Sequence, residues 1–211
     1  MLATLLMVGM GQAFAAGHEL SFEASRIGVA GPSWDVVSAD PGYASVGLRG
    51  VYGFSKNLGL VVGWQRGVDG SDVEVYSADG GLEEAEFRAG FIGNALRVGP
   101  KAQVARWRWV APYATAQASV SVGRVSFDTD PDRDDNVGQV QDTAWSFGGF
   151  AAAGVDLKPV KVTKGLRLGA HLEAGYGLQS AYRFETNDGA ADLGGFGMRG
   201  LVVSGGAGVR F

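Results

Sequence analysis

The segment 128–136 has the residue types and spacing that could hold a divalent cation. Carboxylates stand at alternate positions, at Asp128, Asp130, Asp132 and Asp134. A calcium loop of the EF-hand type shows this alternation, with glycine at its sixth position and a bidentate glutamate at its twelfth. Arg133 and Gln139 occupy those two positions here. We therefore expect a solvated acidic loop and no metal site, with weak cation binding as the alternative.

His171 and Glu173 form a second candidate, because a histidine near a carboxylate can act as a general acid or base. Two residues apart, they would share one face of a strand. The only other histidine is His18, near the N-terminus. A mid-strand position facing a polar interior argues against catalysis, so we predict no enzyme, no catalytic residue and no cofactor.

Apolar and polar residues alternate from residue 19 onward, with the period of a strand. In residues 166–178, leucine, alanine and tyrosine fall on one face, and mainly glycine and charged residues on the other. Each expected strand is long enough to cross a bilayer when tilted. The prediction is an all-β fold, an eight-stranded antiparallel up-and-down transmembrane β-barrel. The expected strands are 19–30, 43–55, 58–67, 83–97, 108–127, 142–157, 165–184 and 197–211.

The connections between these segments differ in length and charge. Three are short and four are long and rich in glycine and aspartate, which is the layout of an up-and-down barrel. The short ones are 56–57, 98–107 and 158–164, and the long ones are 31–42, 68–82, 128–141 and 185–196. Every lysine of the chain is expected in a short connection: Lys56, Lys101, Lys158, Lys161 and Lys164.

The polar face of the expected strands consists mostly of small residues and carries no lysine. A soluble barrel would expose a densely charged exterior, so the apolar face is expected to point outward to lipid. Aromatic residues near the strand ends are typical of interfacial girdles. They are Tyr52, Phe54, Trp107 and Trp109 near the short connections, and Trp64, Trp145, Tyr182 and Phe184 near the long ones.

Residues 1–16 are predicted to be a signal peptide, and residues 17–211 the barrel. A short apolar run leads to Ala13 and Ala15, which form a small-x-small cleavage signal. The net charge is −4, and no basic stripe is interleaved with aromatics, so nucleic acid is excluded as a partner.

The last strand resembles the terminal strand of bacterial outer-membrane proteins. It ends in Phe211, preceded at alternate positions by apolar residues that include Val209, Val203 and Leu201. Residues 51–60 resemble the first periplasmic turn of OmpA-like and OmpX-like barrels. The resemblance implies a monomer in the bacterial outer membrane, in contact with its lipid and lipopolysaccharide. It also implies that Phe211 is an assembly signal for the barrel-assembly machinery, and we expect no peptidoglycan-binding domain.

Seven charged residues fall on the expected lumen face, where isolated charge is costly and opposite charges should pair. This pattern resembles the ionic plug of OmpA-like barrels and implies a structural or surface-interaction protein with a closed lumen and acidic extracellular loops. The alternatives are a narrow pore for small solutes and, less favoured, a lipid A-modifying enzyme. The seven residues are Glu23, Arg49, Glu86, Arg88, Arg167, Glu173 and Arg210.

Overall fold

The structure is a computed structural model that describes residues 17–29, 42–75, 85–129, 140–157, 159–185 and 192–211. Within these ranges, the side chains of residues 71–75, 85–88, 127–129, 140, 185 and 192–194 are not described. The expected signal peptide at residues 1–16 lies outside the described residues and stays a prediction. In the described part of the chain, no helix is long and apolar enough to cross a membrane.

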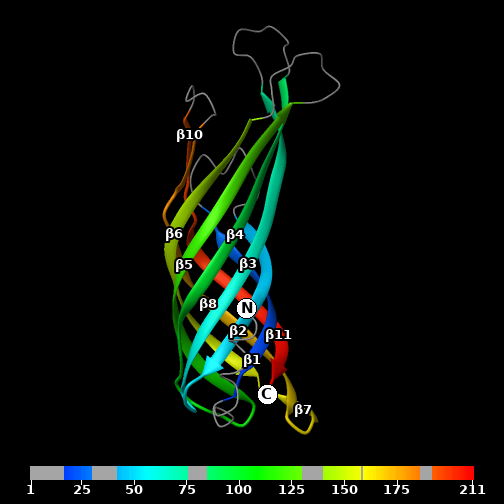
Figure 1. Ribbon diagram of the computed structural model, residues 1–211, viewed down its shortest axis with the longest axis vertical. Coiled ribbons are helices and arrows are strands. Elements are labelled where there is room, and N and C mark those ends of the chain that lie inside the picture. Colours follow the sequence, from blue (N-terminus) through cyan, green and yellow to red (C-terminus); the bar gives the residue numbers. More distant parts are fainter. Residues whose placement is uncertain (1–16, 30–41, 76–84, 130–139, 158, 186–191) are drawn as a thin grey trace, which may run out of the picture.

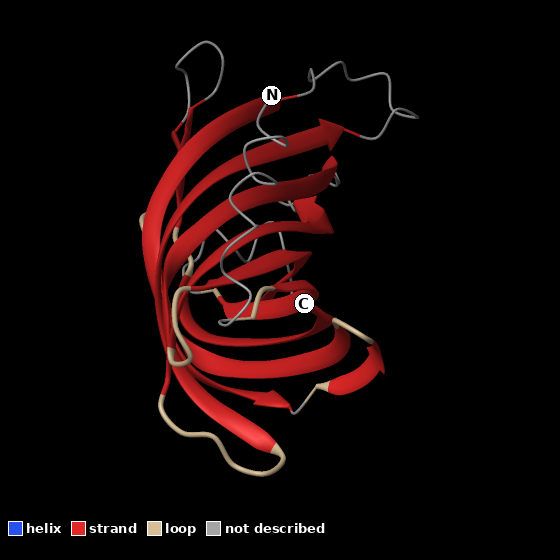
Figure 2. Cartoon of the chain, turned by 60° about the horizontal axis from the view of Figure 1, so that its bottom comes forward, coloured by secondary structure: helices blue, strands red, loops and turns tan. Residues whose placement is uncertain are grey.

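Eight long antiparallel strands form the barrel wall, as predicted (Figures 1 and 2). β11 pairs with both β1 and β8, and this double pairing closes the sheet on itself. Closure leaves no unpaired sheet edge around the waist of the barrel, which is the condition for a sheet to cross hydrocarbon. The wall strands are β1 (Glu19–Gly28), β2 (Gly42–Gly53), β3 (Leu58–Val75), β4 (Ala85–Gln103), β5 (Val110–Thr129), β6 (Val140–Leu157), β8 (Leu166–Gln179) and β11 (Arg199–Arg210).

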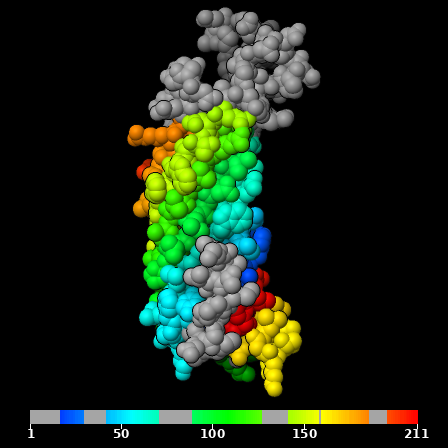
Figure 3. Space-filling view, in the orientation of Figure 1, coloured from blue at the N-terminus to red at the C-terminus, as the bar shows by residue number. Residues whose placement is uncertain are grey.

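The wall is taller on one side than the sequence pattern predicted. β3 and β4 pair continuously from Leu58↔Ala102 to Val75↔Ala85, so residues 68–75 of the expected long loop 68–82 are strand backbone. The expected short connection 98–107 is also shorter than predicted, because residues 98–103 belong to β4. In the space-filling view, cyan to yellow-green atoms of β3 to β6 lie side by side on the visible face (Figure 3).

Three short strands lie outside the wall. β7 (Val160–Thr163) pairs with the start of β8 at the short-turn end, and β9 (Tyr182–Glu185) pairs with β10 (Asp192–Phe196) near the long-loop end. The expected strand 165–184 is therefore interrupted. At Ser180, just after β8 ends, the chain leaves the regular strand pairing. Ser180 donates its N–H to the Phe147 carbonyl, and the Ser146 hydroxyl donates to the Ser180 carbonyl.

The two faces of each wall strand differ in burial, as the alternation predicted. On β1, Glu19, Ser21 and Glu23 are buried inside, whereas Leu20 and Phe22 are half exposed on the outside. Among the described side chains, large exposed apolar residues occur on every wall strand except β5. Contact of so much apolar surface with water would be unfavourable, so the outer face of this barrel contacts lipid.

The seam between β1 and β11 is completed by the last residue. Phe211 donates its N–H to the His18 carbonyl at 3.0 Å, and His18 donates its own to the Phe211 carbonyl at 2.9 Å. On β11, Leu201 and Val203 are exposed on the lipid face and Val209 is half-buried. This geometry places the proposed assembly signal at the closing seam.

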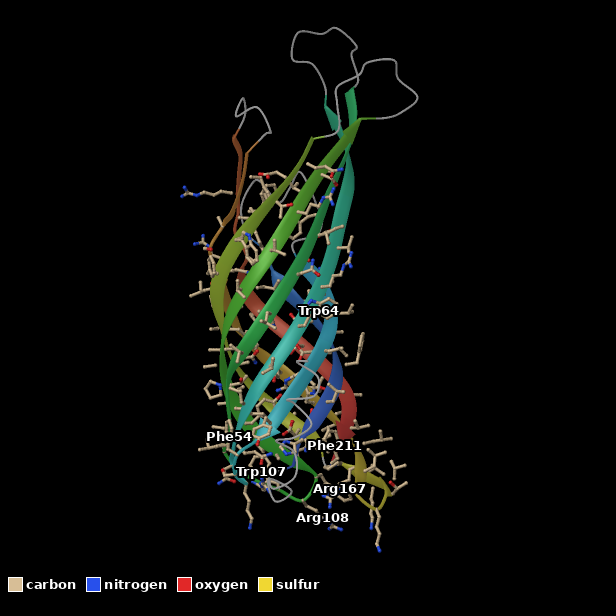
Figure 4. All side chains as sticks on the ribbon, viewed as in Figure 1. Phe54, Trp64, Trp107, Arg108, Arg167 and Phe211 are labelled. Atoms are coloured by element: carbon tan, nitrogen blue, oxygen red, sulfur yellow. The ribbon has the colours of Figure 1, made fainter. Side chains whose placement is uncertain are left out.

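Deletion of Phe211 should therefore cause loss of folded, heat-modifiable barrel from the outer membrane and accumulation of unfolded chain. Both seam hydrogen bonds disappear together with the terminal aromatic ring. Phe54→Ala is the control, because Phe54 is an exposed aromatic at the same end and makes no seam contact (Figure 4). Near-normal amounts of folded protein from the deletion would refute the assignment.

Candidate functional site in the lumen

The half of the lumen nearer the short turns is filled by charged side chains, which we call the ionic tier. Its members come from six of the wall strands and are buried except for the partly exposed Arg210. Since the interior of an eight-stranded barrel is only wide enough for side chains, they must meet one another. The ionic tier consists of Glu19, Glu23, Arg49, Lys101, Asp156, His171, Glu173 and Arg210.

Arg49 is at the centre of the ionic tier, with only 2% of its side chain exposed. Its Nη2 donates to Glu173 Oε1 at 2.6 Å, and its Nε lies 3.7 Å from Glu23 Oε2. Tyr113 also donates its hydroxyl to Glu173 Oε1, at 2.6 Å. Charge-assisted bonds this short are among the stronger ones in proteins, so Glu173 is held from two sides.

A second group of ion pairs lies next to it, toward the short turns. Lys101 Nζ is 2.8 Å from both carboxylate oxygens of Asp156. Arg210 Nη2 bridges Asp156 Oδ1 at 3.1 Å and Glu19 Oε2 at 2.6 Å. Each carboxylate of this group therefore contacts a cation at hydrogen-bond distance.

His171 lies between two carboxylates and is 1% exposed. Its Nδ1 is 3.6 Å from Glu19 Oε1, and its Nε2 is 3.4 Å from Glu23 Oε2. The imidazole connects the two groups of ion pairs. It faces the lumen and is enclosed by the wall, as its place in the middle of an alternating strand predicted.

The half of the lumen nearer the long loops is filled by apolar and aromatic side chains, which we call the aromatic tier. Phe91 contacts Tyr43 at 5.5 Å and Tyr182 at 5.4 Å between ring centroids, both edge-to-face. Phe184 packs against Phe196 at 5.3 Å. The larger buried members are Ile27, Tyr43, Phe91, Val125, Phe150, Tyr182, Phe184, Phe196, Met198 and Val202.

Gly123 makes room for the aromatic tier. A Cβ atom at this position would lie 2.8 Å from the Phe91 ring and 3.0 Å from the Tyr182 ring. The Tyr182 hydroxyl donates to Ser121 Oγ at 2.7 Å, so its polar end is satisfied inside the barrel. The rings therefore pack closely against the wall as well as against one another.

The prediction that Tyr182 and Phe184 belong to the outer aromatic girdle is wrong. Both side chains are fully buried, because the strand is interrupted at Ser180 and the even-numbered residues, which face outward on β8, face inward on β9. The other predicted girdle residues are exposed: Tyr52, Phe54, Trp64, Trp107, Trp109 and Trp145. Phe54, Trp64 and Trp107 are labelled in Figure 4.

The structure brings together four of the seven residues expected in the lumen, namely Glu23, Arg49, Glu173 and Arg210. Arg167, expected with them, is instead exposed at the short-turn end (Figure 4). It is close to the end of the barrel, where its side chain reaches water. Glu86 and Arg88 lie on β4, but their side chains are outside the described residues.

Glu19, Lys101 and Asp156 were not predicted as pairing residues. Lys101 was expected in a turn, whereas it lies on β4 and points inward. Extending the strand alternation from Arg97 by two steps would have placed Lys101 on the lumen face. The acidic loop from Asp130 to Asp134 lies outside the described residues, and among the described ones no group of histidine and acidic side chains is arranged to hold a metal.

Comparison with known proteins found no matching family model and no matching curated protein. Several solved structures of outer-membrane proteins are similar in fold. The attachment invasion locus protein Ail of Yersinia pestis, in complex with the heparin analogue sucrose octasulfate, is 15% identical over 93% of this chain and 99% of that chain, with a TM-score of 0.47. The outer membrane protein OprG from Pseudomonas aeruginosa is 12% identical over 93% of this chain and 96% of that chain, with a TM-score of 0.48. A major outer membrane protein from Thermus thermophilus is 13% identical over 92% of this chain and 99% of that chain, with a TM-score of 0.48.

The strand register and the two faces of the wall define the fold of this chain. Eight antiparallel strands close into a ring, and apolar side chains cover the outside of that ring. The chain is a transmembrane barrel of the bacterial outer-membrane type.

Arg49→Ala should lower the free energy of unfolding by roughly 3–5 kcal/mol, because it leaves Glu173 and Glu23 buried without their shared cation. Arg167→Ala is the matched control and should change it by less than about 0.5 kcal/mol, since Arg167 is exposed. Guanidinium unfolding in lipid vesicles, followed by tryptophan fluorescence, measures both. Equal losses from the two variants would contradict the ionic tier.

Proposed function

We propose that this protein is a structural or surface-interaction barrel of the outer membrane with a closed lumen. The observation that carries the proposal is the succession of two differently built tiers along one narrow interior. An ion must pass the paired charges around Arg49 and then the packed rings around Phe91. With the interior filled, specific interactions would be made by the outer surface and by the long loops.

The outer surface supports contact with phosphorylated outer-leaflet lipid, including lipopolysaccharide. On β3, the exposed Arg66 is the next outward-facing residue after Trp64. On β5, the exposed Arg124 is the next outward-facing residue after Val122. β4 separates the two strands, with Asn94 paired to Arg66 and Ile92 paired to Arg124. Guanidinium groups bind phosphate through two parallel hydrogen bonds, so exposed arginines beside the apolar residues of the outer face suit lipid phosphates.

Two other functions are less well supported. A narrow pore would need a water path through the aromatic tier, where Phe91, Tyr182 and Phe184 pack ring against ring. A lipid A-modifying enzyme would need its histidine near lipid, whereas His171 is enclosed between Glu19 and Glu23. We therefore propose a non-enzymatic, monomeric barrel that the barrel-assembly machinery inserts through its terminal strand.

Planar bilayer recordings test the closed lumen. The wild-type barrel should pass no steady current, and opening one tier at a time should leave the other closed. Glu173→Ala and Tyr182→Ala should each remain silent, and the double variant should conduct. The control double variant, Phe54→Ala with Arg167→Ala, alters only exposed residues at one end and should stay silent.

Folding of each variant is checked by heat modifiability before recording. A steady current through the folded wild type would reject the closed lumen and favour the narrow pore. A folded double variant that remains silent would show that the two tiers are not the barrier to ions.

A further inference from the structure

A cavity of about 960 Å³ opens at the short-turn end of the barrel, adjoining the ionic tier. All three short turns contribute to its lining, and Arg106, Trp107 and Arg108 come from the β4–β5 turn. Its inner wall includes Lys101 and Asp156 of the ionic tier. Trp107, Arg108, Arg167 and Phe211, all lining residues, gather at this end of the molecule (Figure 4). We call this cavity the basic vestibule.

The charge of the basic vestibule is strongly positive. Two acidic side chains line it: Glu19 is paired with Arg210, and Asp156 with both Arg210 and Lys101. Six further cations line it, all of them exposed, and none forms an ion pair with another side chain in the described part of the chain. They are Lys56, Arg106, Arg108, Lys161, Lys164 and Arg167.

Two of these cations are held in place by local contacts. Arg106 donates from its guanidinium to the backbone carbonyl of Lys56, which joins two of the turns. The guanidinium carbon of Arg108 lies 5.1 Å from the centre of the Trp109 ring. Side chains fixed in this way lose less conformational freedom when a ligand binds between them.

Like charges collected around one cavity repel each other unless an anion neutralises them, and a concave wall concentrates their field. The whole chain carries a net charge of −4, so this positive site is not a consequence of a basic composition. One carboxylate would neutralise a small part of it. A ligand with several negative groups would reach cations from more than one turn.

We propose that the basic vestibule binds a multivalent, phosphate-bearing anion. Three of its six available cations are arginines, whose planar forks match phosphate oxygens two at a time. The volume lies within the range of pockets for small ligands. The phosphate groups could belong to a soluble phosphate ester or to headgroups of anionic phospholipid in the leaflet around the short turns.

The test uses the purified full barrel in lipid nanodiscs of pure phosphatidylcholine, with tripolyphosphate as the probe in isothermal titration calorimetry. Binding is expected at low salt, with weaker affinity as salt is added. The triple variant Lys161→Gln, Lys164→Gln, Arg167→Gln removes three of the six exposed lining cations, all from residues 159–167, and should lower the affinity at least tenfold.

The matched control is Arg26→Gln, Arg183→Gln, Arg199→Gln, which removes three exposed cations near the long-loop end that do not line the basic vestibule. It should leave the affinity unchanged. No binding by the wild type, or equal weakening by the two triple variants, would overturn the proposal. The same titration in nanodiscs containing phosphatidylglycerol separates the two sources. Competition by that lipid identifies headgroups as the occupant, unchanged affinity identifies a soluble anion, and either result supports the site.

Discussion

The neutralisation of charge inside a narrow closed ring is the constraint on which the rest of this structure depends. Eight strands enclose an interior that is only wide enough for side chains, so no buried charge can rely on bulk water. Arg49 meets this constraint by contacting Glu173 and Glu23, which come from two other strands, and Tyr113 adds a hydrogen bond to Glu173. The pair of Arg49 with Glu173 joins β2 to β8, which are far apart in sequence and are not neighbours in the wall. It can form only when the wall has closed in this register.

Such pairs are weak evidence for stability, because desolvation offsets much of their attraction. The ion pairs contribute more to the choice of strand register. A slip of the register by one residue would turn Glu23 or Arg49 outward to lipid, where a charge is costly. The lipid face imposes the complementary demand, since Leu20 and Phe22 would then point into the charged interior. The two faces together therefore select one register of β1.

The fold could be predicted from the sequence because alternation is a local property that every strand displays. The lengths of β3 and β4 could not be, because their pairing continues into a segment rich in glycine and aspartate, where strand propensity is low. The members of the ionic tier were predictable in part, since parity places Glu23 and Arg49 on the lumen face. Their partners depend on register around the whole ring, which no single strand encodes.

The aromatic tier was missed for a different reason. Tyr182 and Phe184 have the composition of girdle residues, and only the departure of the chain from the wall at Ser180 sends them inward. That departure depends on hydrogen bonds between Ser180 and the neighbouring β6, at Ser146 and Phe147. Ser146 and Ser180 are ordinary residues in a strand pattern, so the sequence does not indicate that the chain leaves the wall at this point.

The two ends of the barrel present different side chains to water. The proposed closed lumen would let each end act separately from the other. An open channel would let ions equilibrate between the ends and would join the field of the basic vestibule to the opposite mouth. With the ionic and aromatic tiers between the ends, the cations around Arg108 and Arg167 act only on molecules at their own side. A plug of this kind isolates the vestibule electrically as well as sterically. Screening by salt limits its field to about 10 Å at 0.1 M, a range that reaches adjacent headgroups and solutes but not the far loops.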